Sequence, residues 1–412
     1  MKVLHLNHSD ILGGAARATY RIHNALWRAG LDSWMGVDHR ASDDWKVFGP
    51  RNRLEKALVR LRPTIGAAAT RLLKTGNQIL HSPGLLSTSW PKRLKELKPD
   101  IVHLHWICNE MLSIQDIGRL SGPIVWTLHD MWAFCGAEHY SCDFRWQDGY
   151  MRNNRPHHES GLDLNRWVWE RKRKQWERPI QIVTPSKWLA ECVRKSMLMR
   201  DWPVSIIPNP IDTDVWAPVD QRIARSLLGL PLDVPLVLFG AILGGTQSIK
   251  GFDLLLESLR CLGKTRKDLC IVVFGQSAPQ KSLSLPFIIH YMGHIHDDIT
   301  LRILYSAADV MVIPSRKDNL PNTGVEALSC GIPVVAFNTS GLPDIVEHKK
   351  TGYLANPFEP EDLAAGVCWV LDASDNLNLA RNARNKVLST FAAHRIAAEY
   401  IKLYDKILSD HF

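Results

Sequence analysis

The sequence predicts an α/β protein of two doubly wound parallel-sheet domains. Three observations lead to this prediction. Apolar runs of strand length alternate with amphipathic helical runs, the alternation restarts after residue 215, and a proline-rich stretch over 204–218 separates the two halves. The chain has 412 residues, more than one ordinary core requires, because domains usually contain about 100–200 residues. We therefore place a domain boundary between residues 210 and 211, with the first domain over 1–210 and the second over 211–392.

In the first half, strands lead into helices as a parallel sheet requires. The first strand runs through Gly13-Gly14 into a helix over 15–30, whose apolar residues recur at helical spacing and which Gly30 ends. Ser186 is a candidate N-cap for a second helix over 186–196. The strands expected in this half are 2–7, 33–37, 99–106, 123–130 and 181–186.

The second half repeats the pattern and ends in helices. Its expected strands are 235–241, 269–275, 287–293, 310–315 and 334–337, and its expected helices include 251–262 and 299–310. From Glu359 onward the residues favour helix almost throughout.

Composition restricts the function classes. Apolar residues make up 45% and charged residues 22%, as in a globular protein that is soluble or lies on a surface. The net charge of +8 suits an anionic partner, but no basic-aromatic motif indicates nucleic acid. Eight cysteines without a CxxC pair, and an N-terminus without a signal-peptide pattern, favour a cytoplasmic setting. The GGAAR run is not GxGxxG, so a nicotinamide cofactor is not expected.

Two stretches depart from the strand–helix alternation. Residues 51–75 hold seven basic residues against one acid, interleaved with leucines, which predicts either a helix lying on an anionic membrane or an ordinary solvated basic face. Residues 131–178 begin as a long polar and aromatic loop, of the kind that is usually functional or mobile, and become a basic helix. Cys135, His139 and Cys142 in this loop have zinc-like spacing, but no fourth ligand is evident, and no metal is expected.

The stretch from Asp318 to Val335 carries the chemistry of the second half. It predicts strand, loop, helix and strand, with Asp318 in the loop and Glu326 one turn into the helix. Ligands of open parallel sheets bind at this carboxyl edge, where helix N-termini attract anions. Asn322 and Thr323 begin the helix and can offer backbone amides to a diphosphate, and Glu326 can accept hydrogen bonds from ribose hydroxyls.

A second anion site is predicted at Lys250, where a glycine-rich loop over 240–251 meets a helix start. The order of residues is not that of a Walker loop. Asp212-Thr213-Asp214 has the form of a manganese-binding DxD, but its place in the proline-rich stretch argues against that role.

Four motifs together resemble glycosyltransferase family 4, a retaining nucleotide-sugar family with the GT-B fold, in which two Rossmann-like domains face each other across a cleft. They are PNPIDTDVWAP, KGFDLL, YSAADVMVIPS and D-x7-E-A-L-x-C-G-x-P-V-V. Three further segments, DNLPNT, FGA at a strand end and HDMWAF, are similar to those of the branch that builds bacterial surface polysaccharides such as O-antigen, capsule or exopolysaccharide.

For the second half, the resemblance implies that Glu326 holds the donor ribose and that Asp318 contacts the donor sugar near the reacting centre. It implies that Lys250, Asn322 and Thr323 bind the diphosphate. The nucleotide base is expected near Gly293 and His294.

For the first half, the resemblance implies that Gly13 and Gly14 face the phosphates and that His129 meets the donor sugar, and we expect Asp130 near the acceptor hydroxyl. The final helix over 393–412 is expected to pack back on the first domain. The implied activity needs a nucleotide-sugar donor and a glycan acceptor, which we expect to be lipid-linked, and it needs neither cofactor nor metal.

Two departures from the family pattern keep alternatives open. The first acid is usually Glu, where this chain has Asp318, and many members have an arginine just after the strand that ends here at Phe239-Gly240-Ala241. These departures suggest a catalytically silent glycan-binding scaffold as one alternative function. A nucleotide-sugar epimerase of the same fold is the other, because neither the proline-rich stretch nor the acid pair excludes it.

Overall fold

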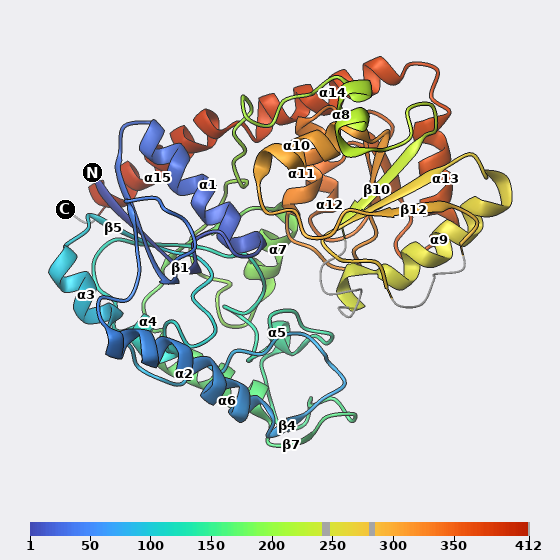
Figure 1. Cartoon of the computed structure of the whole chain (residues 1–412). Helices are drawn as coiled ribbons and strands as arrows, with labels where there is room; N and C mark the ends of the chain where they lie inside the picture. The colour runs from blue at the N-terminus through green and yellow to red at the C-terminus, as the bar shows by residue number, and fades with distance from the viewer. Residues whose placement is uncertain (241–247, 280–284, 411–412) are drawn as a thin grey trace. The chain divides into compact units, whose positions relative to one another are not determined.

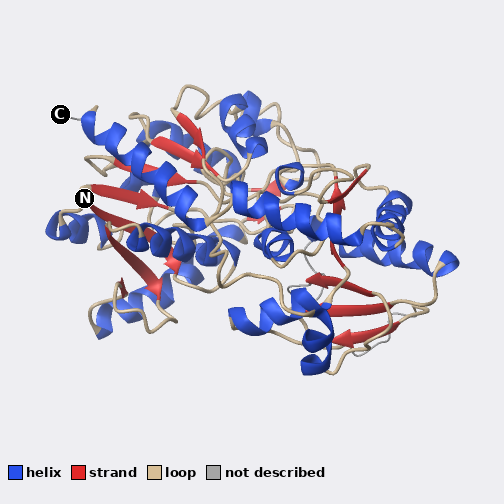
Figure 2. Ribbon diagram, turned by 90° about the horizontal axis from the view of Figure 1, so that it is seen from above, coloured by secondary structure: helices blue, strands red, loops and turns tan. Residues whose placement is uncertain are grey.

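The computed structural model describes residues 1–240, 248–279 and 285–410. The chain divides into two compact units, Met1–Pro210 with Ile396–Phe412 and Ile211–Arg395. Each unit contains one parallel β-sheet with helices on both faces (Figures 1 and 2). The predicted fold class, two doubly wound α/β domains, is confirmed.

Unit 1 is built on a seven-stranded sheet of order β3-β2-β1-β5-β6-β8-β9, with every neighbouring pair parallel. The strands are β1 (Lys2–Ser9), β2 (Asp32–His39), β3 (Val47–Phe48), β5 (Ile101–Leu104), β6 (Ile124–Thr127), β8 (Gln181–Thr184) and β9 (Val204–Ile206). The helices are α1 (Gly14–Arg28), α2 (Arg53–Thr70), α3 (Trp90–Leu97), α4 (Ile114–Gly118), α5 (Arg145–Asp148), α6 (Leu164–Gln175) and α7 (Lys187–Lys195). A separate antiparallel pair joins β4 (Leu73–Lys74) and β7 (Ser160–Gly161).

The two faces of the unit 1 sheet differ in chemistry, because neighbouring residues of a strand point to opposite faces. One face is apolar: Leu4, Leu6 and Trp126 pack in a core with Trp90 of α3. The other face carries buried histidines, which meet the tyrosines of the last helix, α15 (Ala393–Ser409). The sheet is therefore buried on both sides, as parallel sheets generally are.

Unit 2 has a six-stranded parallel sheet of order β12-β11-β10-β13-β14-β15. Alternate residues of its strands enter two apolar cores, one on each face. The strands are β10 (Leu236–Gly240), β11 (Cys270–Phe274), β12 (Ile288–Tyr291), β13 (Val310–Ile313), β14 (Val334–Phe337) and β15 (Gly352–Ala355). The helices are α8 (Gln221–Leu228), α9 (Phe252–Thr265), α10 (Asp298–Ala307), α11 (Asn322–Ser329), α12 (Leu342–Ile345), α13 (Pro360–Leu371), α14 (Asn376–Thr390) and the start of α15.

Three local expectations are corrected. The strands expected over 99–106 and 123–130 end at Leu104 and Thr127, so His129 lies in a loop. The basic segment 51–75 is helical only to Thr70. Edge strand β15 was not expected, because its sequence, GYLA, is too short to show a strand pattern.

The stretch after residue 131 is a loop, as expected, but its first residues are buried. Met131, Trp132, Phe134 and Cys135 are buried in the apolar core of unit 1. Lys172 of α6, itself fully buried, donates hydrogen bonds to the carbonyls of residues 132, 135 and 136. The aromatic residues of this loop therefore belong to the apolar core, and Lys172 satisfies the backbone carbonyls that are buried with them.

Candidate functional site

Asp318 lies in the loop that connects β13 to α11, and it is 8% exposed. Its carboxylate accepts hydrogen bonds from Lys250 Nζ at 2.7 Å and from Ser315 Oγ at 3.2 Å. Its backbone N–H donates to Ser340 Oγ at 3.0 Å. These contacts fix both the carboxylate and the loop at the carboxyl edge of the unit 2 sheet.

Lys250 reaches Asp318 because the start of α9 lies directly against the end of β13. Gly251, the N-cap of α9, has φ +67°, and a Cβ atom there would lie 1.9 Å from the carbonyl oxygen of Pro314. The backbone N–H of Arg316 donates to the carbonyl of Ile249 at 2.8 Å. Only glycine allows this approach, so the KG pair of the sequence positions the lysine as well as supplying it.

Part of the glycine-rich loop that was expected to hold the phosphates, residues 241–247, lies outside the described residues. Ala241, the strand-end position discussed above, is among them. Arg316 is near Lys250 in the chain's fold, but its guanidinium binds the carboxylate of Asp253 through two contacts of 2.6 Å. This side-chain and electrostatic contact with Arg316 lowers the pKa of Asp253.

Glu326 lies on the inner side of α11 and is 3% exposed. One carboxylate oxygen accepts a hydrogen bond from Tyr305 Oη of α10 at 2.9 Å. The Tyr305 ring is in turn edge-on to Phe274 at the end of β11, with the centroids 5.7 Å apart. A buried carboxylate costs free energy unless it is hydrogen-bonded, and Tyr305 provides such a bond.

Asn322 and Thr323 are the first two residues of α11, and no side chain caps its N-terminus. A Cβ atom at Gly324 would lie 2.9 Å from Ile313 Cδ1, so the helix start packs closely against the end of β13. The partial positive charge of the helix N-terminus therefore lies at the same sheet edge as Lys250 and Asp318.

Gly293 and His294 follow edge strand β12. The N–H of Gly275 donates to the carbonyl of Gly293 at 2.7 Å, Gly293 has φ +64°, and His294 is exposed. Strand order places them two strands from β10, at the carboxyl edge of the sheet. The structure thus groups Lys250 with Asp318 and places the other predicted donor residues of unit 2 at the same edge.

In unit 1, Gly13 and Gly14 form the start of α1. Gly13 is the N-cap with φ +97°, no side chain caps this helix start, and its first turn contains no acid. The preceding loop is held by the buried Asp10, which accepts from the backbone N–H groups of Ile11, Ala41 and Ser42. The glycine is required for this backbone conformation, and the helix N-terminus favours an anion.

His129 follows β6 and is half-buried, with its Nε2 3.3 Å from His105 Nδ1. Burial lowers the pKa of His129 to about 4, although Asp130 opposes the shift. The ring is therefore neutral at pH 7 and can both donate and accept a hydrogen bond.

Asp130 is anchored by three donors. His139 Nδ1 lies 2.6 Å, Trp106 Nε1 2.9 Å and the backbone N–H of Trp132 2.9 Å from its oxygens. Burial alone raises the pKa of Asp130, but His139 and the other donors lower it below its usual value. Asp130 is thus a structural anchor for the loop beside His129, and its expected place near an acceptor hydroxyl stays a prediction.

The structure does not gather the zinc-like set Cys135, His139 and Cys142. Cys135 is buried and Cys142 exposed, while both ring nitrogens of His139 have partners in Asp130 and Ser82. Among the described residues, the side chains close enough to share a metal are His5, His103 and His105, whose nitrogens lie within 4.8 Å of one another. His103 uses both nitrogens on the hydroxyls of Tyr404 and Thr127, so hydrogen bonds account for its place in this cluster.

Three residues of the unit 2 site were not assigned a role from the sequence. Tyr305, Ser315 and Ser340 contact Glu326 or Asp318. The first two are the ends of the motif YSAADVMVIPS, so the signal was present there. Ser340 comes from the loop after β14 and has no local pattern that marks it.

Comparison with known proteins bears on this arrangement. A family model described as Glycosyltransferase Family 4 matches residues 12–215, and one described as Glycosyl transferases group 1 matches 235–373. D-inositol 3-phosphate glycosyltransferase 2 of Catenulispora acidiphila is 29% identical over 224 residues, which are 50% of this chain and 51% of that protein. The chain therefore spans about half the length of this curated relative.

Solved structures share the fold over nearly the whole chain. Anabaena HepE in complex with UDP-glucose has a TM-score of 0.63 and 17% identity, covering 98% of this chain and 100% of that one. WaaG, a glycosyltransferase involved in lipopolysaccharide biosynthesis, has a TM-score of 0.64 and 17% identity, covering 98% and 99%. With matching models over both halves and two Rossmann-like domains, the chain belongs to glycosyltransferase family 4 and has the GT-B fold.

Proposed function

We propose that this protein is a retaining glycosyltransferase that moves a sugar from a nucleotide-diphosphate donor to a glycan acceptor. The observation that carries the proposal is the Lys250–Asp318 ion pair beside the N-terminus of α11, with Glu326 one turn further on. A cation, a helix N-terminus and two carboxylates at one sheet edge suit the diphosphate, the ribose and the donor sugar. The complex of HepE with UDP-glucose supports a donor of this class.

Transfer places negative charge on the β-phosphate as the sugar departs. Lys250 and the amides that begin α11 would stabilise this charge electrostatically, which is the task that a metal ion performs in other transferases. A diphosphate at this place would share the ammonium of Lys250 with Asp318. Asp318 would then hold the lysine in position and face the sugar.

The acceptor we propose is a lipid-linked glycan in bacterial surface polysaccharide synthesis. The support is the outer face of α2, where Leu54, Leu58, Leu61 and Ile65 repeat at helical spacing and are 70%, 39%, 54% and 39% exposed. Exposed basic residues accompany them, among them Arg53, Lys56 and Arg60. Of the described helices, none is both long and apolar enough to cross a bilayer. An apolar stripe with basic neighbours fits the surface of an anionic membrane instead, and WaaG supports a lipopolysaccharide-related role.

Product analysis with a panel of UDP-, GDP- and ADP-sugars tests the activity, with a detergent extract of bacterial lipid-linked glycans as acceptor. Release of nucleoside diphosphate only when the extract is present supports transfer. A donor converted to its epimer without release supports the epimerase alternative. Binding without any turnover in the complete panel supports a silent scaffold.

Sedimentation with vesicles that contain 30% anionic lipid tests the membrane contact. We expect the double variant Leu54→Ser/Leu61→Ser to lose most of the binding, and we expect the wild type to bind less as salt rises. Leu227→Ser, on the surface of α8 in unit 2 with 66% of the leucine exposed, is the matched control. Binding that neither salt nor the double variant changes would contradict the contact.

A further inference from the structure

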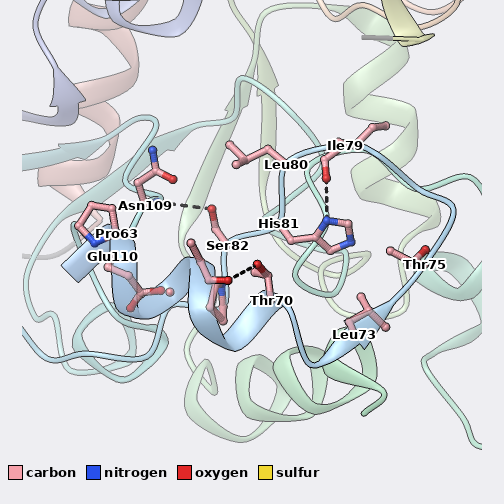
Figure 3. Close-up of a pocket in the computed structure, with 13 residues that line it drawn as sticks. Pro63, Thr70, Leu73, Thr75, Ile79, Leu80, His81, Ser82, Asn109 and Glu110 are labelled. Carbon is pink, nitrogen blue, oxygen red and sulfur yellow. Dashed lines mark hydrogen bonds between the residues drawn. The ribbon is translucent and has the colours of Figure 1, made fainter. Parts of the chain in front are cut away.

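A cavity of about 300 Å³ lies in unit 1 beneath α2, between the inner side of this helix and residues 79–83 (Figure 3). Pro63, Gly66 and Thr70 line it from α2, and Asn109 and Glu110 line it from the loop after β5. This volume is at the small end of ligand pockets, which suits a single sugar ring better than a nucleotide.

Two of the residues that line the cavity, Glu110 and His81, each have a buried polar atom without a hydrogen-bond partner, Oε1 and Nε2 respectively. Glu110 is 1% exposed, and its other oxygen accepts from the backbone N–H groups of Leu85 and Leu86 at 2.6 and 3.0 Å. Figure 3 shows Glu110 and His81 well apart among the labelled lining residues. Buried polar atoms usually have a hydrogen-bond partner, because an unsatisfied one destabilises the folded protein.

Both unpartnered atoms are hydrogen-bond acceptors. Nδ1 of His81 lies 2.6 Å from the carbonyl oxygen of Ile79, so Nδ1 carries the proton and Nε2 of the neutral ring holds a lone pair. Burial lowers the pKa of His81, which keeps the ring neutral. The carboxylate oxygen of Glu110 is an acceptor as well. A ligand that satisfies both must offer hydrogen-bond donors at two places.

The backbone around Glu110 adopts an unfavourable conformation. Asn109 and Glu110 have φ +53° and +62°, a left-handed conformation that Asn tolerates and Glu rarely adopts. Such conformations persist where the surrounding structure enforces them, and they are frequent at ligand sites. Burial raises the pKa of Glu110, and the backbone N–H groups of residues 84–86 oppose the rise.

The composition of the lining further restricts the ligand. No lysine or arginine is among the described residues that line the cavity, so nothing there suits a phosphate. The lining includes both apolar residues, such as Leu73, Ile79 and Pro83, and residues with hydroxyls, namely Thr70, Thr75 and Ser82. Apolar patches with acceptors and hydroxyls around them suit a pyranose, whose C–H faces are apolar and whose hydroxyls point outward.

The cavity is connected to the loop that holds His129. Ser82 Oγ lies 3.5 Å from the N–H of Asn109 and 2.8 Å from His139 Nε2, and the other ring nitrogen of His139 binds Asp130 at 2.6 Å. Glu110 and His129 both follow the carboxyl ends of neighbouring strands, β5 and β6. The opposite side of α2 carries the exposed leucines.

We infer that this cavity binds a neutral sugar ring of the glycan acceptor, and that the side chains of Glu110 and His81 turn towards the ring so that Oε1 and Nε2 accept hydrogen bonds from its hydroxyls. The inference rests on the proposed function for the identity of the ligand as acceptor. A sugar held here would lie under the helix that we propose to contact the membrane, an arrangement that suits a lipid-linked acceptor.

Saturation-transfer NMR with a panel of methyl pyranosides tests the inference without turnover, and two variants alter the cavity in different ways. Glu110→Gln removes the charge and places an amide at Oε1 or Oε2. Gly66→Ala leaves every charge in place, but its Cβ would lie 3.0 Å from Glu110 Cγ and 3.1 Å from Oε1. Alanine also has a higher helix propensity than glycine, so this change does not destabilise α2. Glu170→Gln, at a residue of α6 with 42% side-chain exposure, is the control.

We expect at least one pyranoside to bind the wild type and the control, and to bind Glu110→Gln and Gly66→Ala at least tenfold more weakly. Melting curves and nucleotide diphosphate binding, measured on the same samples, should stay unchanged. If Glu110→Gln fails to fold, the affinity of Gly66→Ala for the pyranoside tests the inference by itself. A wild type that binds no pyranoside of the panel, or variants that bind as the wild type does, would overturn the inference. If the wild type binds no nucleotide diphosphate, that result would instead count against the proposed function.

Discussion

Lys250 and Asp318 form an ion pair with 2.7 Å between Nζ and Oδ2, although they are 68 residues apart in the chain. The lysine side chain is 45% exposed and the aspartate side chain 12% exposed. An ion pair with one accessible partner contributes little to stability, because solvent screens it. Its value is geometric: the aspartate holds an accessible cation at the sheet edge where an anion would bind.

Lys250→Ala should weaken the binding of nucleotide diphosphate. The loss of one charge-assisted hydrogen bond costs about 2 kcal/mol, or roughly thirtyfold in the dissociation constant. Calorimetric titration measures it, with Lys264→Ala on the exposed side of α9 as the matched control. Equal affinity in Lys250→Ala and wild type would place the phosphates elsewhere.

Asp318→Ala should separate binding from turnover. Without the carboxylate, Lys250 loses its partner, so nucleotide affinity should stay within about threefold or increase, whereas transfer should fall by at least about a hundredfold. Steady-state rates and titrations of the same preparation give both quantities. Turnover at the wild-type rate would show that Asp318 is not a catalytic residue.

Tyr305→Phe should weaken binding of the donor indirectly, by removing a hydrogen bond to Glu326. The change removes the hydroxyl that donates to Glu326 and keeps the ring against Phe274. A buried carboxylate that loses a donor costs about 1–3 kcal/mol, so the melting temperature should fall and KM for the donor should rise about tenfold with a smaller change in kcat. An unchanged KM would indicate that Tyr305 has only a packing role.

The buried histidines of unit 1 should make the fold sensitive to acid. Burial lowers the pKa of His23 to about 4, from about 6.5 when unfolded, and Asp44 opposes the shift. The unfolded chain therefore binds more protons between these pH values. The free energy of unfolding should fall by about 1.4 kcal/mol per pH unit for each such histidine as the pH drops from 6.5 to 4.

His23→Asn should flatten this part of the stability curve, whereas His294→Asn, at an exposed histidine, should not. Urea titrations between pH 4 and 7 measure the slope. Equal slopes in His23→Asn and wild type would mean that His23 is protonated without penalty in the folded protein.

The fold class was predictable because strands that are buried on both faces appear as short apolar runs, and glycines and prolines mark their ends. The pairing of Lys250 with Asp318 was not, because it depends on Gly251 approaching the carbonyl of Pro314, which joins two distant segments. Tyr305 lay within a motif, but a motif does not state which of its residues contacts Glu326. The loop after residue 131 was predictable, but its burial was not, because its aromatic residues are interspersed with polar ones and its carbonyls are satisfied by the distant Lys172.

The cavity under α2 shows a similar limit. Glu110 has no sequence neighbour that marks it as a ligand-binding residue, and its place depends on two successive residues with positive φ. Backbone conformations of this kind in non-glycine residues are rare and leave little trace in a single sequence.

We propose that unit 2 holds a nucleotide-diphosphate sugar at the start of α11. Calorimetric titration of UDP, GDP and ADP into the wild type and into Glu326→Ala tests it most directly. We expect one of the three nucleotides to bind the wild type with a dissociation constant in the micromolar range. Glu326→Ala should bind it at least tenfold more weakly while remaining folded. Failure of all three to bind the wild type, or equal binding by Glu326→Ala, would contradict it.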